Sequence, residues 1–184
     1  MKSFAELVKN RRSIRQFAEE KLKAEEVELI VKAALTAPTS RNCRAWKFIL
    51  IEDQETLRQL ALSKTTGAAF LEQCALAIVV LSDPVQSTAP VEDTSIAAAY
   101  IQLQAEDLGL GSCWCQITGR ETGNGQDSEE YVRDLLNIPD PYRITCIVAV
   151  GHKEKAGKPH EEEDLLWENV YIERFTENPQ TNSD

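Results

Sequence analysis

The strongest constraint on the fold comes from two mainly apolar runs, ALAIVVL at 75–81 and RITCIVAVG at 143–151. Both have the length of a strand and fall far short of the roughly 20 apolar residues that a membrane-spanning helix needs. Neither run alternates regularly between apolar and polar residues, so we expect each to be a fully buried strand. Two further strands are predicted at 46–52 (WKFILIE) and at 111–117 (GSCWCQI).

Helical patterns separate these strands. Apolar residues recur at helical spacing over 27–35, and this helix should end at Ala37, because the residue before Pro38 is pushed out of the helical region. Further helices are expected at 3–11, 53–63, 93–109 and 128–138.

The helix predicted at 93–109 is apolar on almost every side. Ile96, Tyr100 and Leu103 form one stripe, while alanines and other aliphatic residues lie on the remaining sides. Such a helix must be covered on more than one face. Either the domain buries it alone, or part of its surface packs on a second copy of the chain, with the alanines allowing a close approach.

Composition excludes several classes of protein. The chain has 20 lysines and arginines against 30 aspartates and glutamates, and the net charge of −10 disfavours nonspecific binding to nucleic acid or to an anionic membrane. The start of the sequence lacks the apolar segment of a secretory signal. The cysteines number five, an odd count in a chain large enough to form its own core, so we expect reduced thiols and a cytoplasmic protein.

No short motif predicts a metal or an activated nucleophile. Cys113 and Cys115 are separated by one residue, and no second cysteine pair stands at zinc-binding spacing. The two histidines, His152 and His160, share no helical turn. The sequence also lacks a Walker loop, a dinucleotide fingerprint and a nucleophile elbow.

Against this acidic background, RRSIRQF at 11–17 places three arginines within five residues. A nucleic-acid patch is disfavoured, because nothing basic continues the stripe and the net charge opposes it. Two interpretations remain: a cluster on the surface, or a phosphate site in which guanidinium groups bind phosphate oxygens bidentately and a serine adds a donor. Spacing alone does not choose between them.

Several motifs follow one another in a distinctive order: RRSIRQF, APTSRNCRAWKF, the alanine-rich helix, LGLGSCWCQI and IVAVGHKEKAGKP. This series resembles the nitroreductase family, whose members are homodimeric flavoproteins that bind FMN. The resemblance implies an α+β fold with a mixed, mostly antiparallel sheet of about four strands flanked by helices. It also implies that LLWENVYIERF at 165–175 extends to the sheet of the partner subunit. We expect one domain over 1–175 and a disordered tail over 176–184.

The resemblance also assigns contacts to FMN. The residues that match the family's first FMN motif, which holds the phosphate, the ribityl chain and part of the ring's polar edge, are Arg11, Arg12, Ser13 and Arg15. Those that match the loop reaching the flavin from the partner subunit are Pro38, Thr39, Ser40 and Asn42. With these assignments the phosphate interpretation of the arginine cluster is favoured over the surface interpretation.

Two further segments match the family. The segment that lies along the isoalloxazine, with a backbone N–H near the reactive ring nitrogen, corresponds to Trp114, Cys115 and Gln116. The basic residue that the family places on the phosphate after the last strand corresponds first to Lys158 and second to Lys155.

The resemblance implies a reaction that begins with hydride transfer from NADH or NADPH to the flavin. The reduced flavin then passes hydride to a nitroaromatic, quinone or enone by a ping-pong mechanism. FMN carries out the redox chemistry, so no catalytic side chain is predicted. Two alternatives stay open: another reaction on the same scaffold, such as flavin fragmentation, reductive dehalogenation or azoline oxidation, or a flavin-binding module without turnover.

One stretch departs from the family pattern. Many members carry amide or lysine side chains before the second strand, where they contact the pyrimidine edge of the flavin. The corresponding region here reads KTTGAAFLEQ, from which we expect only Thr65, Thr66 or a backbone group to serve. The long insertion that shapes the substrate pocket of larger members is also missing.

Overall fold

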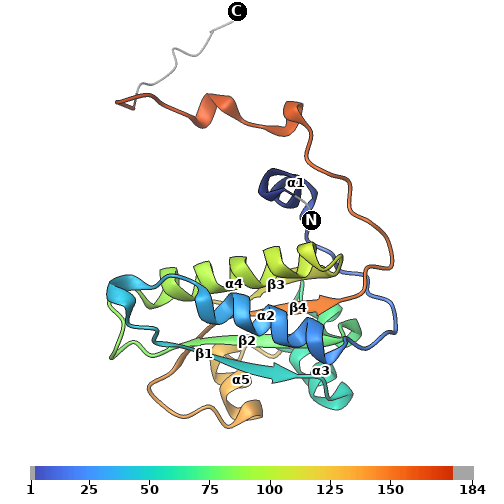
Figure 1. Cartoon of the computed structure of the whole chain (residues 1–184). Helices are drawn as coiled ribbons and strands as arrows, with labels where there is room; N and C mark the ends of the chain where they lie inside the picture. The colour runs from blue at the N-terminus through green and yellow to red at the C-terminus, as the bar shows by residue number, and fades with distance from the viewer. Residues whose placement is uncertain (1–2, 176–184) are drawn as a thin grey trace, which may run out of the picture.

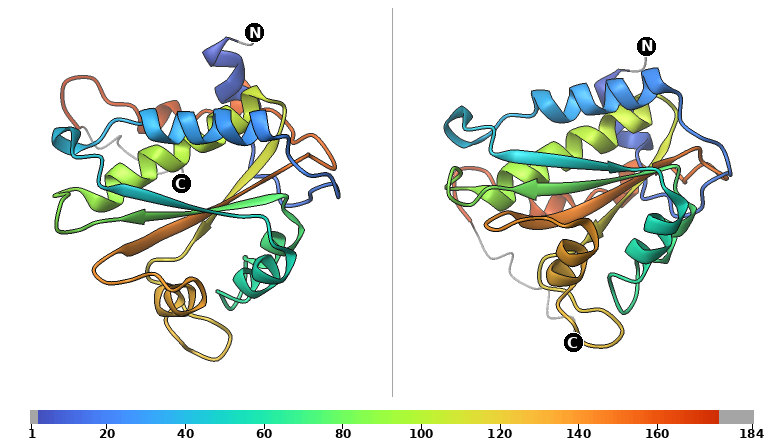
Figure 2. Two further views of the ribbon diagram at one scale, coloured as in Figure 1. Left: turned by 60° about the horizontal axis from the view of Figure 1, so that its bottom comes forward. Right: turned by 90° about the horizontal axis from the view of Figure 1, so that it is seen from below.

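The computed structural model describes residues 3–175, and its sheet carries helices on both faces (Figures 1 and 2). Within these residues four strands form one sheet in the order β1-β2-β4-β3. Their bounds are Trp46–Ile51 for β1, Leu76–Ser82 for β2, Gly111–Gln116 for β3 and Arg143–Gly151 for β4. The predicted tail over 176–184 lies outside the described residues.

The sheet is antiparallel in each of its neighbouring strand pairs. A parallel component is present in the described chain as an isolated bridge between Ser13 and Ser112, outside the named strands. The predicted mostly antiparallel α+β architecture is therefore confirmed, with the parallel contribution confined to the segment that contains the arginine cluster.

The predicted helices are present, each within a few residues of its expected ends. Their bounds are Phe4–Asn10 for α1, Ala24–Thr36 for α2, Gln54–Ala61 for α3, Pro90–Asp107 for α4 and Ser128–Leu136 for α5. Helix α2 ends where the sequence requires it, because Ala37 takes a ψ of 136° in front of Pro38. No helix in the described part of the chain is long and apolar enough to cross a membrane.

Burial on both faces explains why β2 is a continuous apolar run. Its side chains alternate: Leu76, Ile78 and Val80 point to the face covered by α2 and α4, whereas Ala77 and Val79 point to the face covered by α3 and α5. Figure 2 shows the helices in these two layers. The sheet is therefore the middle layer of a three-layer structure, as expected for strands without polar alternation.

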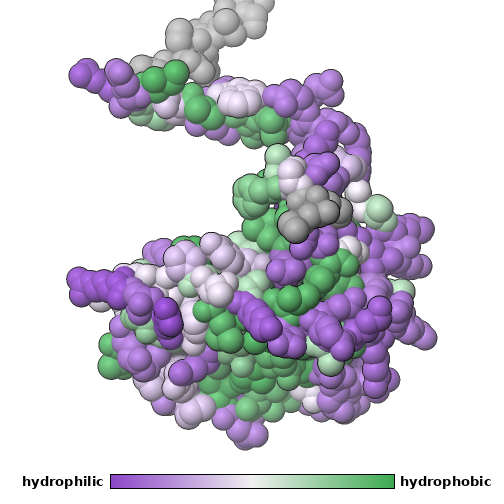
Figure 3. Space-filling view, in the orientation of Figure 1, coloured by the Kyte–Doolittle hydropathy of each residue, from purple (hydrophilic) through white to green (hydrophobic). Residues whose placement is uncertain are grey.

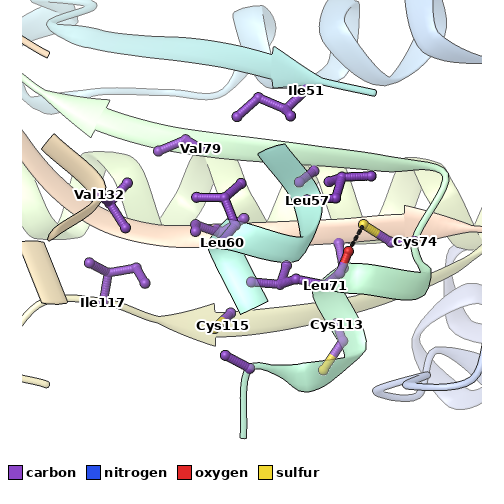
Figure 4. Packing of buried hydrophobic residues seen from close by; sticks show 14 of the residues in the cluster. Ile51, Leu57, Leu60, Leu71, Cys74, Val79, Cys113, Cys115, Ile117 and Val132 are labelled. Carbon is purple, nitrogen blue, oxygen red and sulfur yellow. Dashed lines mark hydrogen bonds between the residues drawn. The ribbon is translucent and has the colours of Figure 1, made fainter. Parts of the chain in front are cut away.

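Figure 4 shows the core on the second of these faces, which we call the α3/α5-face core. Leu57 and Leu60 of α3 point toward the sheet beside Val79, and Val132 of α5 closes the far side. The same cluster contains Cys113 and Cys115, whose side chains therefore point into the core.

Helix α4 is only partly covered by its own chain. Its small side chains are buried against α2 and the sheet, among them Ala97, Ala98 and Ala105. The predicted apolar stripe stays accessible, with Ile96 and Tyr100 each 38% exposed. The domain thus covers the alanine side of α4 and leaves the other apolar side for a further contact.

The segment after β4 leaves the body of the molecule. Residues 165–175 run outward beyond α1, and in Figure 1 they form the orange-red arm at the top. Their secondary structure includes a short 3-10 helix over Trp167–Asn169. Large apolar side chains on this arm are exposed, including Leu166, Trp167 and Ile172. Its extension across the sheet of a partner stays a prediction.

Replacing Leu60 with alanine tests the α3/α5-face core. Leu60 is fully buried, so we expect the free energy of unfolding to fall by about 2–5 kcal/mol through lost burial and a residual cavity. The control is Leu62→Ala at the end of the same helix, where the side chain is 66% exposed and the expected change is within about 0.5 kcal/mol. Urea denaturation measures both, and equal effects would contradict the described packing.

Candidate functional site

The arginine cluster lies on an extended segment beside the edge strand β3. Helix α1 ends at Asn10, and the next residue, Arg11, has φ and ψ of −62° and 120°, which turn the chain into an extended conformation. The N–H of Ile14 donates to the carbonyl of Ser112 at 2.9 Å, next to the parallel bridge formed by Ser13. The side chain of Ile14 is buried in the α3/α5-face core. It therefore anchors the segment, while the arginines on either side of it remain accessible.

Two glycines allow the close contacts around this segment. A Cβ at Gly111 would lie 2.8 Å from Cγ2 of Ile14, and a Cβ at Gly157 would lie 2.7 Å from Cβ of Arg12. Separations this short are not sustained by real side chains, so both positions need glycine for the segment to lie where it does.

Three basic side chains act on the thiol of Cys113. Burial raises the pKa of Cys113, while the charges of Arg15, Arg11 and Lys64 and a hydrogen bond with Ser13 oppose that rise. Because the pKa is still raised overall, the thiol stays neutral at neutral pH and does not offset the positive charge around it. The cluster therefore presents a local positive field in an acidic protein.

Lys64 is the residue that the sequence reasoning overlooked. The hydroxyl of Thr65, which was expected to serve, lies 3.1 Å from the carbonyl oxygens of both Glu121 and Thr122 and so tethers the loop after β3. Lys64 instead carries the charge next to Cys113 and Cys115. An open cavity of about 450 Å³ lies beside it, with Arg120 also in its wall. The sequence did contain a signal for Lys64, because KTTGAAFLEQ begins with a lysine and many family members carry an amide or a lysine in this region.

A second basic group surrounds Arg12. Its Nη1 lies 3.2 Å from Nδ1 of His160, on the loop that follows β4. The pKa of Asp164 is lowered, mainly by the N–H of Glu161 and further by the charges of Lys158, His160 and Arg12. Lys158 and Lys155 are both exposed on this loop. Which of them would bind a phosphate stays a prediction.

The predicted residues on β3 divide between two faces. The side chain of Cys115 is fully buried in the α3/α5-face core, and burial raises its pKa to about 11. Trp114 packs on the opposite face, where its Nε1 donates to Oε1 of Gln116 at 3.0 Å. Nε2 of Gln116 in turn donates to the carbonyl of Thr118 at 3.0 Å. The Cys115 side chain is therefore directed into the core and not toward the edge of the sheet.

The backbone of β3 offers donors at the sheet edge. In an antiparallel pair, the N–H and C=O of alternate residues point toward the neighbouring strand and those of the residues between point away from it. The carbonyl of Ser112 points away from β4, since it accepts from Ile14. By the same alternation the N–H of Trp114 points outward, just beyond the arginine segment.

The structure does not bring the loop Pro38–Asn42 to this place. That loop precedes β1, whereas the arginine segment lies beside β3, and β2 and β4 lie between these two edges of the sheet. Figure 1 shows the loop, in cyan, at the opposite end of the molecule from the blue segment that joins α1 to α2. Pro38, Thr39, Ser40 and Asn42 therefore cannot complete the site of their own chain.

Comparison with known proteins shows the family of this chain. A sequence model described as the nitroreductase family matches residues 8–69 and 61–152. A protein of Archaeoglobus fulgidus named as an NADH dehydrogenase/NAD(P)H nitroreductase is 33% identical over 168 residues, which cover 89% of this chain and 93% of that protein. The chain belongs to the nitroreductase family.

Other members of the nitroreductase family support the fold. A solved structure described as an FMN-dependent nitroreductase from Clostridium difficile matches with a TM-score of 0.89 and 39% identity, covering 92% of this chain and 98% of that one. A Bacillus subtilis protein named FMN reductase (NADPH) is 27% identical over 173 residues, which cover 83% of this chain and 66% of that protein.

Thiol reactivity tests the described burial of the cysteines. Burial raises the pKa of Cys74 to about 12 and that of Cys115 to about 11, and it also raises those of Cys113 and Cys146. Cys43 alone among the five is not fully buried. At about pH 8, where accessible thiols react as thiolates, we expect a disulfide reagent to modify one thiol rapidly and all five only after unfolding.

The control for this measurement is Cys43→Ser, which should abolish the fast phase. Rapid modification of a second cysteine in the folded protein would contradict the positions of Cys113 and Cys115 inside the core.

Proposed function

We propose that the protein is an FMN-dependent oxidoreductase that takes hydride from NADH or NADPH and passes it to a small organic acceptor. Nitroaromatics, quinones and enones are the acceptor classes we favour. The observation that carries the proposal is the arginine segment held beside β3 in a nitroreductase-family chain. The charges of Arg15, Arg11 and Lys64, which oppose the rise in the pKa of Cys113, support it. The relatives named as an FMN-dependent nitroreductase and an FMN reductase support the choice of flavin.

The residues beside β3 fit the two polar ends of FMN. Arg11 and Arg12 would hold the phosphate together with Lys158, because guanidinium groups grip phosphate oxygens bidentately. Arg15 and Lys64 would face the polar edge of the ring. The outward N–H of Trp114 would donate toward the ring system from the sheet edge. In this arrangement Ser13 adds a hydroxyl between the two ends.

Bound FMN would supply the hydride-accepting chemistry, and the protein would supply position and charge. Arg15 and Lys64 would stabilise negative charge that develops on the ring. The neutral thiol of Cys113 would not offset their positive charge. One accessible face of the flavin would serve the hydride donor and the acceptor in turn, which would make the mechanism ping-pong. No side chain needs to act as an acid or base in this scheme.

We further propose that two copies of the chain share two such sites. Since the loop Pro38–Asn42 lies at the sheet edge opposite the arginine segment, it would reach the flavin held by the other copy. A two-fold dimer would then contain two equivalent sites, each built from both chains.

The unpaired thiols fit a reducing cytoplasmic environment.

Exposed apolar surface supports this assembly. A groove of about 910 Å³ lies between α1 and the C-terminal arm, lined by apolar side chains that include Phe4, Val8, Leu166 and Trp167. Figure 3 shows hydrophobic residues in green on both of these elements. Exposed apolar surface of this kind marks an interaction site. The stripe of Ile96 and Tyr100 on α4 would be covered in the same dimer.

Replacing Arg11 and Arg12 with alanine tests the phosphate site. Hydrogen bonds to charged groups contribute about 1.5–3 kcal/mol each, so losing both arginines should weaken FMN binding by roughly a hundredfold or more. Lysine at both positions should restore only part of the affinity, because it lacks the guanidinium fork. The control is Arg58→Ala, an exposed arginine on α3 that pairs with Glu55 and Glu72. Titration of the apoprotein with FMN measures each variant, and an unchanged dissociation constant would refute the assignment.

Mixing two inactive variants tests the shared site. One variant carries alanine at Arg11 and Arg12, and the other carries alanine at Ser40 and Asn42. After joint unfolding and refolding, random pairing makes half of the dimers mixed, each with one intact site, so roughly a quarter of all sites should regain FMN and activity. Mixed dimers that stay inactive would show that the site lies within one chain.

A further inference from the structure

We propose that Asp93, on the first turn of α4, is a positioning residue that holds the loop Pro38–Asn42 in the shape it needs at the partner's flavin. That Asp93 holds the loop is inferred from its contacts. That the shape of the loop affects FMN binding rests on the proposed function. The Asp93 side chain is nearly fully buried, with 3% of the residue exposed. It lies at the point where the loop, the turn before α4 and the helix meet.

Both carboxylate oxygens of Asp93 accept hydrogen bonds. Oδ1 accepts from the backbone N–H of Ser40 at 2.7 Å, and Oδ2 accepts from the thiol of Cys43 at 3.5 Å. Oδ2 also accepts from the hydroxyl of Ser87 at 2.6 Å. The oxygen of that hydroxyl accepts in turn from the N–H of Ala89, which orients it toward Asp93.

This carboxylate is held without an ion pair. The salt bridges formed within residues 3–175 do not include Asp93. Its charge is stabilised by its place in the first turn of α4, where the helix dipole favours an acidic side chain, and by the donors on Ser40, Cys43 and Ser87. The hydrogen bonds therefore fix the Asp93 carboxylate and the loop relative to each other.

The loop itself needs an external restraint. Arg41, Asn42 and Arg44 have φ values of 51°, 53° and 49°, in the left-handed region that residues other than glycine rarely adopt. Such conformations persist only where surrounding contacts impose them. Ser40 and Cys43 bracket the first two of these residues, so Asp93 fastens the strained turn on both sides.

The groups of the loop that Asp93 binds determine which groups of the loop remain available to the FMN site. It binds the backbone N–H of Ser40 and leaves the Ser40 hydroxyl free, while Asn42 stays exposed at the tip of the turn. Thr39 contributes a second fastening, because its hydroxyl accepts from the N–H of Arg44 at 3.0 Å. Because these contacts already order the loop, it can present side chains to a second copy with little further loss of conformational entropy.

The test compares Asp93→Ala and Asp93→Asn with Glu129→Gln. Glu129 is a matched control: it is also a buried carboxylate in the first turn of a helix, but it binds Arg143 and the N–H of Ile144 and not the loop. Two readouts are used for every variant. Amide hydrogen exchange of residues 39–44 in the apoprotein reports loop order, and titration reports the dissociation constant for FMN.

We expect Asp93→Ala to lose protection in residues 39–44 and to bind FMN at least about tenfold more weakly, equivalent to about 1.4 kcal/mol. Asp93→Asn should lie between, because its amide oxygen still accepts from Ser40. Glu129→Gln should lower the melting temperature while leaving both readouts as in the unaltered protein. If the alanine variant fails to fold, the asparagine variant decides the outcome on the same two readouts.

Unchanged exchange in residues 39–44 of the Asp93 variants would overturn the inference. It would also be overturned if their affinity for FMN fell no further than that of Glu129→Gln at an equal loss of melting temperature. An unaltered protein that binds no FMN would instead refute the proposed function, and the exchange measurement would still decide whether Asp93 holds the loop.

Discussion

The contact between Ile14 and Ser112 determines where the positive charge of this protein is placed. The hydrogen bond from Ile14 and its buried side chain hold the start of the extended segment against the sheet, and the buried Phe17, bridged to Lys153, holds its end. Gly111 and Gly157 provide the room, since a side chain at either position would displace Ile14 or Arg12. The positions of Arg11, Arg12 and Arg15 in the candidate site depend on this placement, because they are carried by the residues around Ile14.

The charge distribution is local, and the net charge of −10 does not predict it. Arg11, Arg15 and Lys64 come from two segments far apart in sequence and act on one buried thiol. Burial keeps the Cys113 thiol neutral, so the thiol places no negative charge beside these three basic side chains. An acidic protein can in this way hold an anionic ligand strongly at one point while the rest of its surface repels nonspecific polyanions.

Much of the fold could be predicted from the sequence, because its strongest signals are local. The apolar run of β2 and the proline after α2 predicted a buried strand and a helix end that the structure confirms. The direction of Cys115 could not be predicted with the same ease, since a side chain on a strand changes face with a shift of one residue. Nor could the place of Lys64, which depends on how the end of α3 lies relative to β3, an element that follows much later in the chain.

The arginine motif could be found in the sequence, but its neighbours could not. Arg12 meets His160 across 148 positions of the chain, and Asp93 meets Ser40 across β1, α3 and β2. Such contacts follow from the strand order, which local patterns do not determine. The strand order also shows why the loop Pro38–Asn42 cannot reach the arginine segment of its own chain.

Native mass spectrometry of the protein saturated with FMN tests the central claim most directly, because it counts chains and flavins in one particle. A site built from the arginine segment of one chain and the loop of another predicts a particle of two chains and two FMN molecules. A single chain that retains FMN, or a two-chain particle that binds none, would contradict the account.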